Sequence, residues 1–132
     1  MSLSVHIKKI TGDFQLNVDF EHDRGLTGLL GASGCGKSMM LKCIAGIIKP
    51  DEGRIVLNGR VLFDSEKRIN LKPQERNVGY LFQNYALFPN MNVEQNILCG
   101  LNKEKDRSVR LKEMEEMLKI MELIPCRKLL PH

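Results

Sequence analysis

The chain has 132 residues, of which 42% are hydrophobic and 27% charged, and its formal net charge is +4. This length predicts one domain or part of one, and no apolar run approaches the roughly 20 residues of a membrane span. The basic residues are dispersed, which argues against nucleic acid as a partner. Four scattered cysteines without a C-x-x-C pair or a histidine cluster argue against a metal site. Without a secretory signal, they favour reduced thiols in the cytoplasm.

The first third of the chain alternates in the manner of β-strands. Residues 3–10 and 14–20 alternate apolar and polar side chains, and Gly12-Asp13 between them predicts the tight turn of a hairpin. A polar connection then leads to Leu26 to Leu30, which is typical of a short buried strand. From Lys37 to Gly46 the apolar residues recur at helical spacing and a glycine closes the pattern, so a helix is predicted there.

A glycine-rich loop lies between the predicted strand at residues 26–30 and the helix. Its sequence Gly31-Ala32-Ser33-Gly34-Cys35-Gly36-Lys37-Ser38 fits the pattern G-x-x-x-x-G-K-[ST] of phosphate-binding loops. Glycines let successive N–H groups surround an anion, and the helix that follows adds its partial positive charge. Lys37 is predicted to reach the β- and γ-phosphates, and the Ser38 hydroxyl to bind Mg²⁺. The predicted nucleotide-binding residues are Gly31, Ser33, Gly34, Cys35, Gly36, Lys37 and Ser38. A flexible glycine turn with a surface lysine is the structural alternative.

A second hairpin is predicted after the helix. Residues 50–53 have turn composition, and the strands 54–57 and 60–63 flank Asn58-Gly59, a pair that tolerates the positive φ angles of a type I′ turn. The polar stretch that follows, residues 64–77, is predicted to be irregular. Residues 78–82 then predict another buried strand, which delivers Gln83 to a strand end, where ligand groups gather in open α/β sheets.

Two helices are predicted in the last third. Asn92 caps the first, which begins at Val93, and Gln95 stands in the position of a capping box. Ile97, Leu98 and Leu101 are expected to face inward. The second helix runs from about Asp106 to Leu123.

That second helix carries an apolar stripe. Met114, Met117, Met121 and Ile124 recur at intervals of three, four and three residues, which predicts one face packed in the core. A methionine surface that binds a partner is the alternative, because flexible methionine side chains suit both roles. The lysines and glutamates around the stripe are typical of a solvated face.

Several stretches resemble the ATP-binding subunits of ABC transporters, in particular those of bacterial and archaeal importers. The glycine loop is similar to their Walker A motif, residues 73–83 resemble the run into their Q-loop, and residues 84–93 resemble the stretch that follows in importers of oxyanions, polyamines and sugars. The first hairpin, ending in residues 14–21, is similar to that of the molybdate and tungstate branch. The resemblance implies an α/β fold: a partial P-loop NTPase core, an antiparallel β subdomain and the start of a helical subdomain. Residues 1–132 would form part of one ATP-binding domain, with core and β subdomain in 1–83 and the helical subdomain in 84–132.

The resemblance also implies roles for the site residues. Lys37 and Gln83 would act in catalysis, with Gln83 contacting Mg²⁺ and the attacking water, since a glutamine orients water without adding charge. Residues from Asn84 to Asn96 would dock against an integral-membrane permease, and two copies of the intact subunit would bind ATP and Mg²⁺ as a homodimer. The implied function is coupling of ATP binding and hydrolysis to uptake of an oxyanion such as molybdate, at the cytoplasmic face of the membrane.

The chain departs from the family pattern in two places. Thr11 stands where the family often has an aromatic residue that stacks on adenine, and Phe14 is three residues away, so loose base selectivity is expected. The signature, the Walker B aspartate with its catalytic glutamate, and the switch histidine are not found in the 132 residues. The chain alone is therefore expected to bind nucleotide weakly and to hydrolyse essentially none. A regulatory module that binds ATP or a permease without turnover is the alternative.

Incomplete pairing is a further expectation. Parallel strands need neighbours on both sides, and the chain offers few strands to pair with residues 26–30 and 78–82. Exposed apolar edges are expected, with self-association or strand exchange as their remedy.

Overall fold

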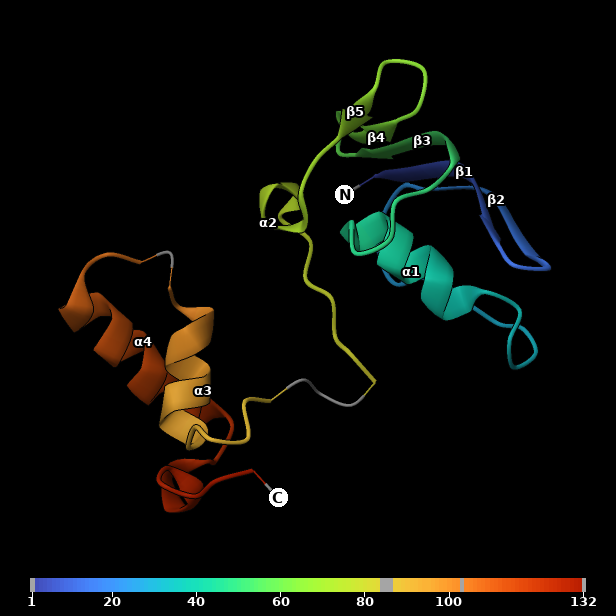
Figure 1. Cartoon of the computed structure of the whole chain (residues 1–132). Coiled ribbons are helices and arrows are strands. Elements are labelled where there is room, and N and C mark those ends of the chain that lie inside the picture. The colour runs from blue at the N-terminus through green and yellow to red at the C-terminus, as the bar shows by residue number, and fades with distance from the viewer. Residues whose placement is uncertain (1, 84–86, 103, 132) are drawn as a thin grey trace. The chain divides into compact units, whose positions relative to one another are not determined.

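The computed structural model describes residues 2–83, 87–102 and 104–131, and divides the chain into two compact units, Met1–Tyr80 and Leu81–His132 (Figure 1). The first unit contains the strands β1 (Leu3–Thr11), β2 (Phe14–His22), β3 (Glu52–Leu57), β4 (Arg60–Asp64) and β5 (Ile69–Asn70), and the helices α1 (Lys37–Ala45) and α2 (Pro73–Arg76). The second contains α3 (Val93–Gly100), α4 (Arg107–Ile120) and the short 3₁₀ helix η1 (Ile124–Cys126). No helix in the described part of the chain is both long and apolar enough to cross a membrane.

The strands of the first unit form one antiparallel sheet in the order β2-β1-β3-β4-β5. Both predicted hairpins are confirmed: β1 pairs with β2 from Leu3 opposite His22 to Thr11 opposite Phe14, and β3 pairs with β4. At the second turn Asn58 has a φ of 50° and Gly59 a φ of 76°. Positive φ at both central residues is the geometry that the Asn-Gly pair predicts for a type I′ turn.

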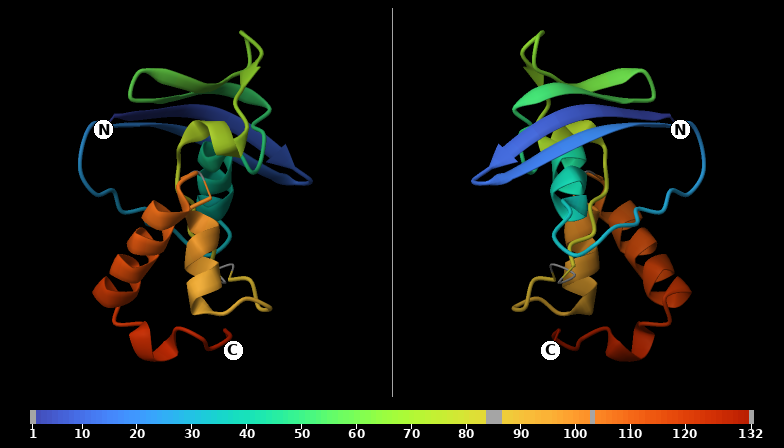
Figure 2. Two further views of the ribbon diagram at one scale, coloured as in Figure 1. Left: turned by 90° about the vertical axis from the view of Figure 1, so that its left-hand side faces the viewer. Right: turned by 90° about the vertical axis from the view of Figure 1, so that its right-hand side faces the viewer.

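Helix α1 covers one face of this sheet (Figure 2). Its buried residues Met40, Cys43 and Ile44 pack with alternate residues of the strands, which include Val5 and Ile55. The helix begins at Lys37 and ends against Gly46, whose φ of 82° closes it, as predicted. Burial of aliphatic side chains, each stabilising by roughly 1.5–3 kcal/mol, holds the helix on the sheet.

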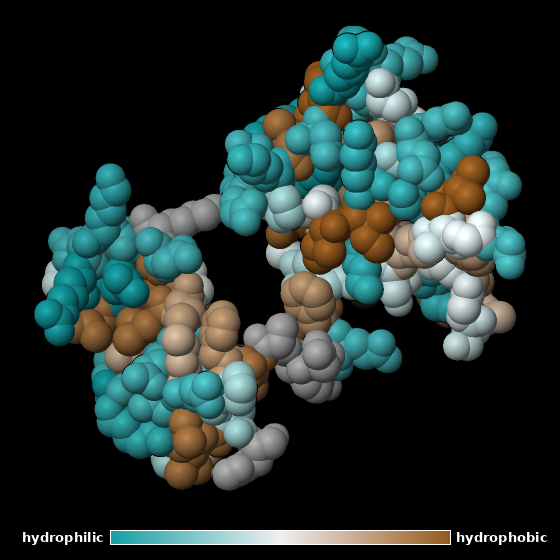
Figure 3. Space-filling model, in the orientation of Figure 1, coloured by the Kyte–Doolittle hydropathy of each residue, from teal (hydrophilic) through white to brown (hydrophobic). Residues whose placement is uncertain are grey.

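The two buried strands predicted at residues 26–30 and 78–82 are not formed, which corrects the sequence analysis. Both segments are irregular, and the side chains of Leu26, Leu30 and Leu81 are 100%, 98% and 79% exposed. A strand needs a neighbour to receive its backbone hydrogen bonds, and no described strand pairs with either segment. Apolar surface is therefore exposed on both units, visible as brown areas in Figure 3.

The segment between Asp64 and Asn77 is more ordered than the sequence predicted. Strand β5 adds two residues to the sheet edge, and Pro73 begins α2 instead of interrupting the chain. Proline suits the first position of a helix, because its fixed φ is helical and its missing N–H would have no partner there. Asn77 ends α2 with a φ of 53°.

The second unit is built on the pair α3 and α4. Asn92 caps α3 as predicted: its side chain accepts from the Gln95 backbone N–H, and the Gln95 side chain accepts from the Asn92 N–H, both at 2.9 Å. Asp106 caps α4 through the N–H groups of Ser108 and Val109. Helix α4 ends at Ile120, three residues before the predicted end at Leu123. The residues predicted to face inward from the first helix, Ile97, Leu98 and Leu101, are half-buried.

The predicted core stripe of α4 is wrong for three of its four members. Met114 is 1% exposed, whereas Met117, Met121 and Ile124 are 44%, 59% and 53% exposed. The second buried residue of the helix is Leu118, one turn beyond Met114. A helix that packs against a single neighbour buries only a narrow strip, so periodicity alone placed the core too widely. The alternative, a methionine surface for a partner, stays a prediction.

Candidate functional site

The glycine loop leads directly into the start of α1. Gly36 is the N-cap residue, with φ 97° and ψ 2°, and no side chain caps the helix there. The first turn contains no acidic residue. A helix start carries partial positive charge on N–H groups that lack an intrahelical acceptor. This end of α1 is therefore suited to an anion, which is the chemistry that the loop sequence predicts.

Lys37 closes the loop on itself. Its Nζ donates to the carbonyl oxygens of Gly31 at 2.7 Å and Ala32 at 2.8 Å, and lies 3.5 Å from the sulfur of Cys35. Lys37 is half-buried and Ser38 exposed. Charge-assisted hydrogen bonds to an ionised oxygen are roughly twice as strong as those to neutral acceptors. A phosphate at the loop would therefore compete well with these carbonyls for the ammonium group.

Two side chains of strand β2 lie close to the glycine loop. A Cβ atom on Gly36 would lie 2.6 Å from Cδ1 of Leu16 and 3.0 Å from Cζ of Phe14, and the φ of Gly36 is in the left-handed region. The loop can approach the strand this closely only because Gly36 has no side chain. Phe14 is half-buried beneath the loop, and Thr11 is exposed at the hairpin end. This support follows from the hairpin register and was not predicted from the sequence.

The seven predicted loop residues lie together on one short segment of the first unit. Gln83 is exposed in a turn of the second unit. Its role beside the phosphates stays a prediction. In the predicted docking segment Asn84 to Asn96, residues 84–86 lie outside the described part of the chain. The remainder is organised by Asn96, whose side chain accepts from the Phe88 N–H at 2.9 Å and donates to the Met91 carbonyl at 2.9 Å.

Arg76 contacts the C-terminal end of α1, a role that was not predicted from the sequence. The side chain is 1% exposed. Its Nη1 donates to the carbonyls of Cys43 and Ile44 at 2.8 and 2.9 Å, and its other nitrogens donate to Leu71 O and Asn70 Oδ1. The C-terminal carbonyls of a helix carry partial negative charge and need donors. Burial lowers the pKa of Arg76. An arginine nevertheless stays charged in proteins, and the partial negative charge of the helix end offsets part of that positive charge.

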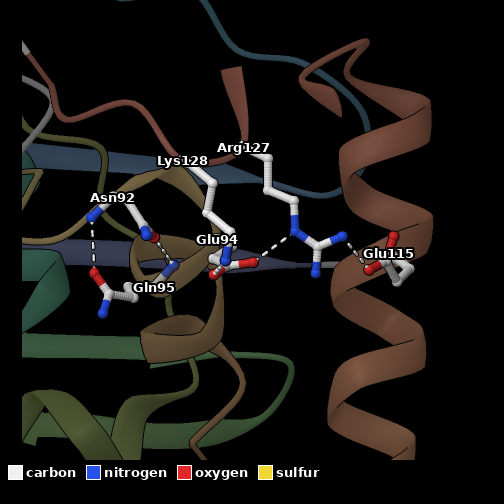
Figure 4. Close-up of polar contacts among 6 residues, drawn as sticks. All are labelled: Asn92, Glu94, Gln95, Glu115, Arg127 and Lys128. Carbon is white, nitrogen blue, oxygen red and sulfur yellow. Dashed lines mark hydrogen bonds and ion pairs between the residues drawn. The ribbon is translucent and has the colours of Figure 1, made fainter. Parts of the chain in front are cut away.

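An ion cluster fixes the start of α3 in the second unit (Figure 4). Glu94 accepts from Arg127 Nε at 2.6 Å and from the Lys128 ammonium, and Arg127 Nη1 reaches Glu115 of α4 at 2.6 Å. Backbone hydrogen bonds from Val93 to Leu129 and from Glu94 to Arg127 run beside it. The cluster thus joins α3, α4 and the segment after η1 through charged side chains.

Acid is expected to weaken this cluster through Glu94. Hydrogen bonds from Lys128 and Arg127 lower the pKa of Glu94 below its ordinary 4.5. The carboxylate therefore stabilises the fold above the unfolded-state pKa, and this contribution disappears as the pH falls below about 4.5 through the folded-state value. Glu94→Gln should unfold at lower urea than the wild type at about pH 7, and the gap should narrow as the pH falls below 4.5. Circular dichroism of urea unfolding measures both midpoints.

The exposed Glu113 of α4 supplies the control. Glu113→Gln removes the same charge from the same unit and should leave the pH dependence of the midpoint unchanged. A difference between Glu94→Gln and wild type that is constant across this pH range would contradict the expectation.

Comparison with known proteins places these features in a wider context. Residues 15–130 match the family model described as ABC transporter. The chain is 54% identical to the molybdate/tungstate import ATP-binding protein WtpC of Methanocaldococcus jannaschii, 45% to WtpC of Archaeoglobus fulgidus, and 41% to the molybdenum import ATP-binding protein ModC of Aliivibrio fischeri. These alignments cover 90%, 94% and 88% of this chain. The chain spans only 40%, 50% and 33% of the three relatives' own lengths.

A solved structure shows the same fold. The dimeric structure of the ABC transporter cassette MJ0796 matches 99% of this chain and 62% of its own length, with a TM-score of 0.73 and 22% identity. At this identity the likeness concerns the fold alone. It confirms the predicted fold class, an α/β P-loop NTPase core in partial form with an antiparallel β part and helices.

Proposed function

Because this chain belongs to the ABC transporter family, we propose that it is the nucleotide-binding part of the ATP-binding subunit of an importer, a transport ATPase when intact. The observation that carries the proposal is the glycine loop, which ends on the uncapped start of α1 with Lys37 beside it. The proposed cargo is an oxyanion such as molybdate or tungstate. Relatives that are 54%, 45% and 41% identical are named for import of molybdate, tungstate or molybdenum, which supports that cargo.

The loop residues fit a triphosphate. Gly34 has a φ of 81° and open space where a side chain would stand, so the backbone can approach an anion closely. Lys37 would move from the Gly31 and Ala32 carbonyls to the phosphate oxygens, and the Ser38 hydroxyl would hold Mg²⁺. The metal would neutralise phosphate charge during hydrolysis. Gln83 would orient the attacking water, since an amide both donates and accepts.

Partners and location follow from the same proposal. We infer that residues 84–96 dock against a membrane permease and that two copies pair as a homodimer, an arrangement supported by the dimeric structure of the MJ0796 cassette. The subunit would lie at the cytoplasmic face of the membrane. The division into a core with β subdomain at 1–83 and a helical region at 84–132 is part of the proposal.

A charge-removal experiment tests nucleotide binding. Lys37→Ala should weaken Mg²⁺-dependent binding of a fluorescent ATP analogue by about tenfold, because one charge-assisted contact to phosphate is lost. Lys67→Ala removes the same charge from an exposed position of the same unit and should bind as the wild type does. Fluorescence anisotropy measures all three affinities.

The same samples test turnover by the 132 residues. The last third of the sequence contains no apolar strand that leads to an acidic pair, so phosphate release should match that of Lys37→Ala. Equal nucleotide affinity in wild type and Lys37→Ala would reject the phosphate site. Phosphate release that vanishes only in Lys37→Ala would reject the proposed lack of turnover while supporting the site.

A further inference from the structure

The sheet of the first unit ends on two different edges (Figure 1). Strand β5 forms one edge with only two residues, whereas β2 forms the other with nine. The pairing of β2 with β1 runs along the whole strand without a shift, and no described strand pairs with the outer side of β2. Proteins commonly protect such edges with a proline, a lysine or a bulge. Strand β2 contains none of these.

Every second residue of β2 directs its backbone groups away from the sheet. The carbonyl of Lys8 in β1 accepts from the N–H of Asp51, the residue before β3, at 2.9 Å. Lys8 therefore directs its backbone groups toward β3. In an antiparallel pair the hydrogen-bonded and non-hydrogen-bonded positions alternate, so Asn17, which lies opposite Lys8, directs its N–H and C=O outward. The same holds for Asp19, two residues later, and these groups can pair with a further strand.

The two faces of β2 carry different side chains. One face is apolar and packs in the core, where Leu16 is buried and the other three residues are half-buried: Phe14, Val18 and Phe20. The opposite face is exposed and presents two amides followed by two carboxylates: Gln15, Asn17, Asp19 and Glu21. A strand added at this edge would cover more of the apolar face and would meet these polar groups on the other.

This pattern is complementary to a second copy of β2 that runs antiparallel to the first. Opposite residues of antiparallel strands lie on the same face, so the allowed registers keep apolar residues together. With Val18 opposite Val18 of the second copy, the full length of both strands is paired. Asn17 then faces Asp19 of the second copy. Gln15 faces its Glu21, so every carboxylate meets an amide.

Other registers satisfy these side chains less well. Centring the pair on Asn17 or Asp19 would shorten the overlap of the two strands. Centring it on Asp19 would also place two carboxylates opposite each other, which is unfavourable. The charges of β2 therefore select the register about Val18, in the way that complementary charges fix the register of an interface.

We propose that two copies of this chain associate through β2, antiparallel about Val18, and join their five-stranded sheets into one. The inference goes beyond the proposed function, because the contact includes no residue of the glycine loop and requires no nucleotide. Both copies use the same edge, so the assembly closes as a dimer. Each cross-strand pair contributes little by itself, so the dimer is expected to dissociate on dilution.

An exchange of two side chains tests the contact. Asn17→Asp places a carboxylate opposite Asp19 of the second copy, twice in each dimer, and should weaken association about tenfold. Lys8 lies opposite this position within the chain, so the sheet accommodates an aspartate there. The double variant Asn17→Asp with Asp19→Asn has the composition and charge of the wild type and should recover its association. Asn102→Asp, the same change at an exposed position of the second unit, should have no effect.

Sedimentation velocity without nucleotide measures the dimerisation of these proteins. Weaker association of Asn17→Asp and its recovery in the double variant support the contact. A monomeric wild type, or equal association of wild type and Asn17→Asp, overturns the proposal, and equal association would assign the contact to apolar surface elsewhere. A double variant that associates as weakly as Asn17→Asp also overturns it.

Hydrogen exchange of the wild type keeps the test independent of variant folding. The amides of Asn17 and Asp19 become hydrogen-bonded in the dimer, so their exchange should slow as the protein concentration rises. NMR measures the two rates across a concentration series. Rates that do not change while the protein associates would contradict the proposed contact.

Discussion

Replacing Gly53 with alanine is expected to destabilise the first unit by about 4 kcal/mol, among the largest effects a single substitution produces. Gly53 lies in β3 opposite Ile7 of β1 and has a φ of 107°. A Cβ atom there would stand 1.9 Å from the carbonyl oxygen of His6 and 2.8 Å from the Cα of Ile7. These are backbone atoms of a central strand, so relief of the clash requires β1 and β3 to separate.

The backbone of Gly53 is also held from the other side. Its N–H donates to Ser65 Oγ at 2.9 Å, and its carbonyl accepts from the Ser65 N–H at 3.0 Å. Ser65 directly follows β4, and these short contacts leave little room for Gly53 to move toward that strand. Urea unfolding followed by far-ultraviolet circular dichroism measures the loss.

Gly59 provides the matched control for this substitution. It too has a positive φ, 76°, but nothing lies within 4 Å of its Cβ position. Gly59→Ala should therefore destabilise the unit only by the backbone conformation, about 1–2 kcal/mol. The difference between the two variants isolates the steric clash. Equal stability of Gly53→Ala and Gly59→Ala would show that β1 yields easily, contrary to the structure.

Features that depend on neighbouring residues were predictable from the sequence. The turn at Asn58-Gly59, the capping box at Asn92 and the helix end at Gly46 each involve contacts within a few residues, so residue types alone specify them. The glycine loop belongs to this class, because its chemistry depends on consecutive backbone groups and on one lysine. Residue types and their spacing were therefore sufficient to locate the candidate phosphate site.

Features that depend on distant partners were not predictable in the same way. Leu26 to Leu30 has the composition of a buried strand, yet composition does not supply the neighbouring strand that a sheet requires. On α4, the spacing of Met114 and Met117 marks an apolar stripe, but only the neighbouring helix decides which part is covered. Arg76 is a third example. A charged residue in a polar stretch is usually exposed, and its burial follows from the helix end it meets.

Helix α1 joins a feature that the sequence predicted, the glycine loop, to one that it did not predict, the buried Arg76. Its first residue, Lys37, faces the loop that the sequence identified, whereas its last carbonyls meet Arg76, which lies more than thirty residues away in sequence. Gly46 makes the second contact possible, because a Cβ atom there would stand 2.5 Å from Nε of Arg76. The position of the helix end that meets the glycine loop therefore depends on a buried cation at the opposite end.

Substitution of Arg76 by methionine is expected to destabilise the first unit by about 3 kcal/mol. Methionine fills much of the same space but donates no hydrogen bonds, so the carbonyls of Cys43 and Ile44 lose their donor, as do Leu71 and Asn70. Each buried acceptor left without a donor is unfavourable by about 1–3 kcal/mol, and partial rearrangement reduces the sum. The loss is measured as the change in the free energy of unfolding in urea.

Two further variants separate the hydrogen bonds of Arg76 from its charge. Arg76→Lys retains the charge but lacks the planar fork that reaches acceptors on both sides, so its stability should lie between wild type and Arg76→Met. Arg60→Met alters an exposed arginine of β4 and should change stability by less than about 0.5 kcal/mol. If Arg76→Lys were as stable as wild type, charge at the end of α1 would suffice. If Arg76→Met were as stable as Arg60→Met, the four hydrogen bonds would contribute nothing measurable, and the helix end would be held by packing alone.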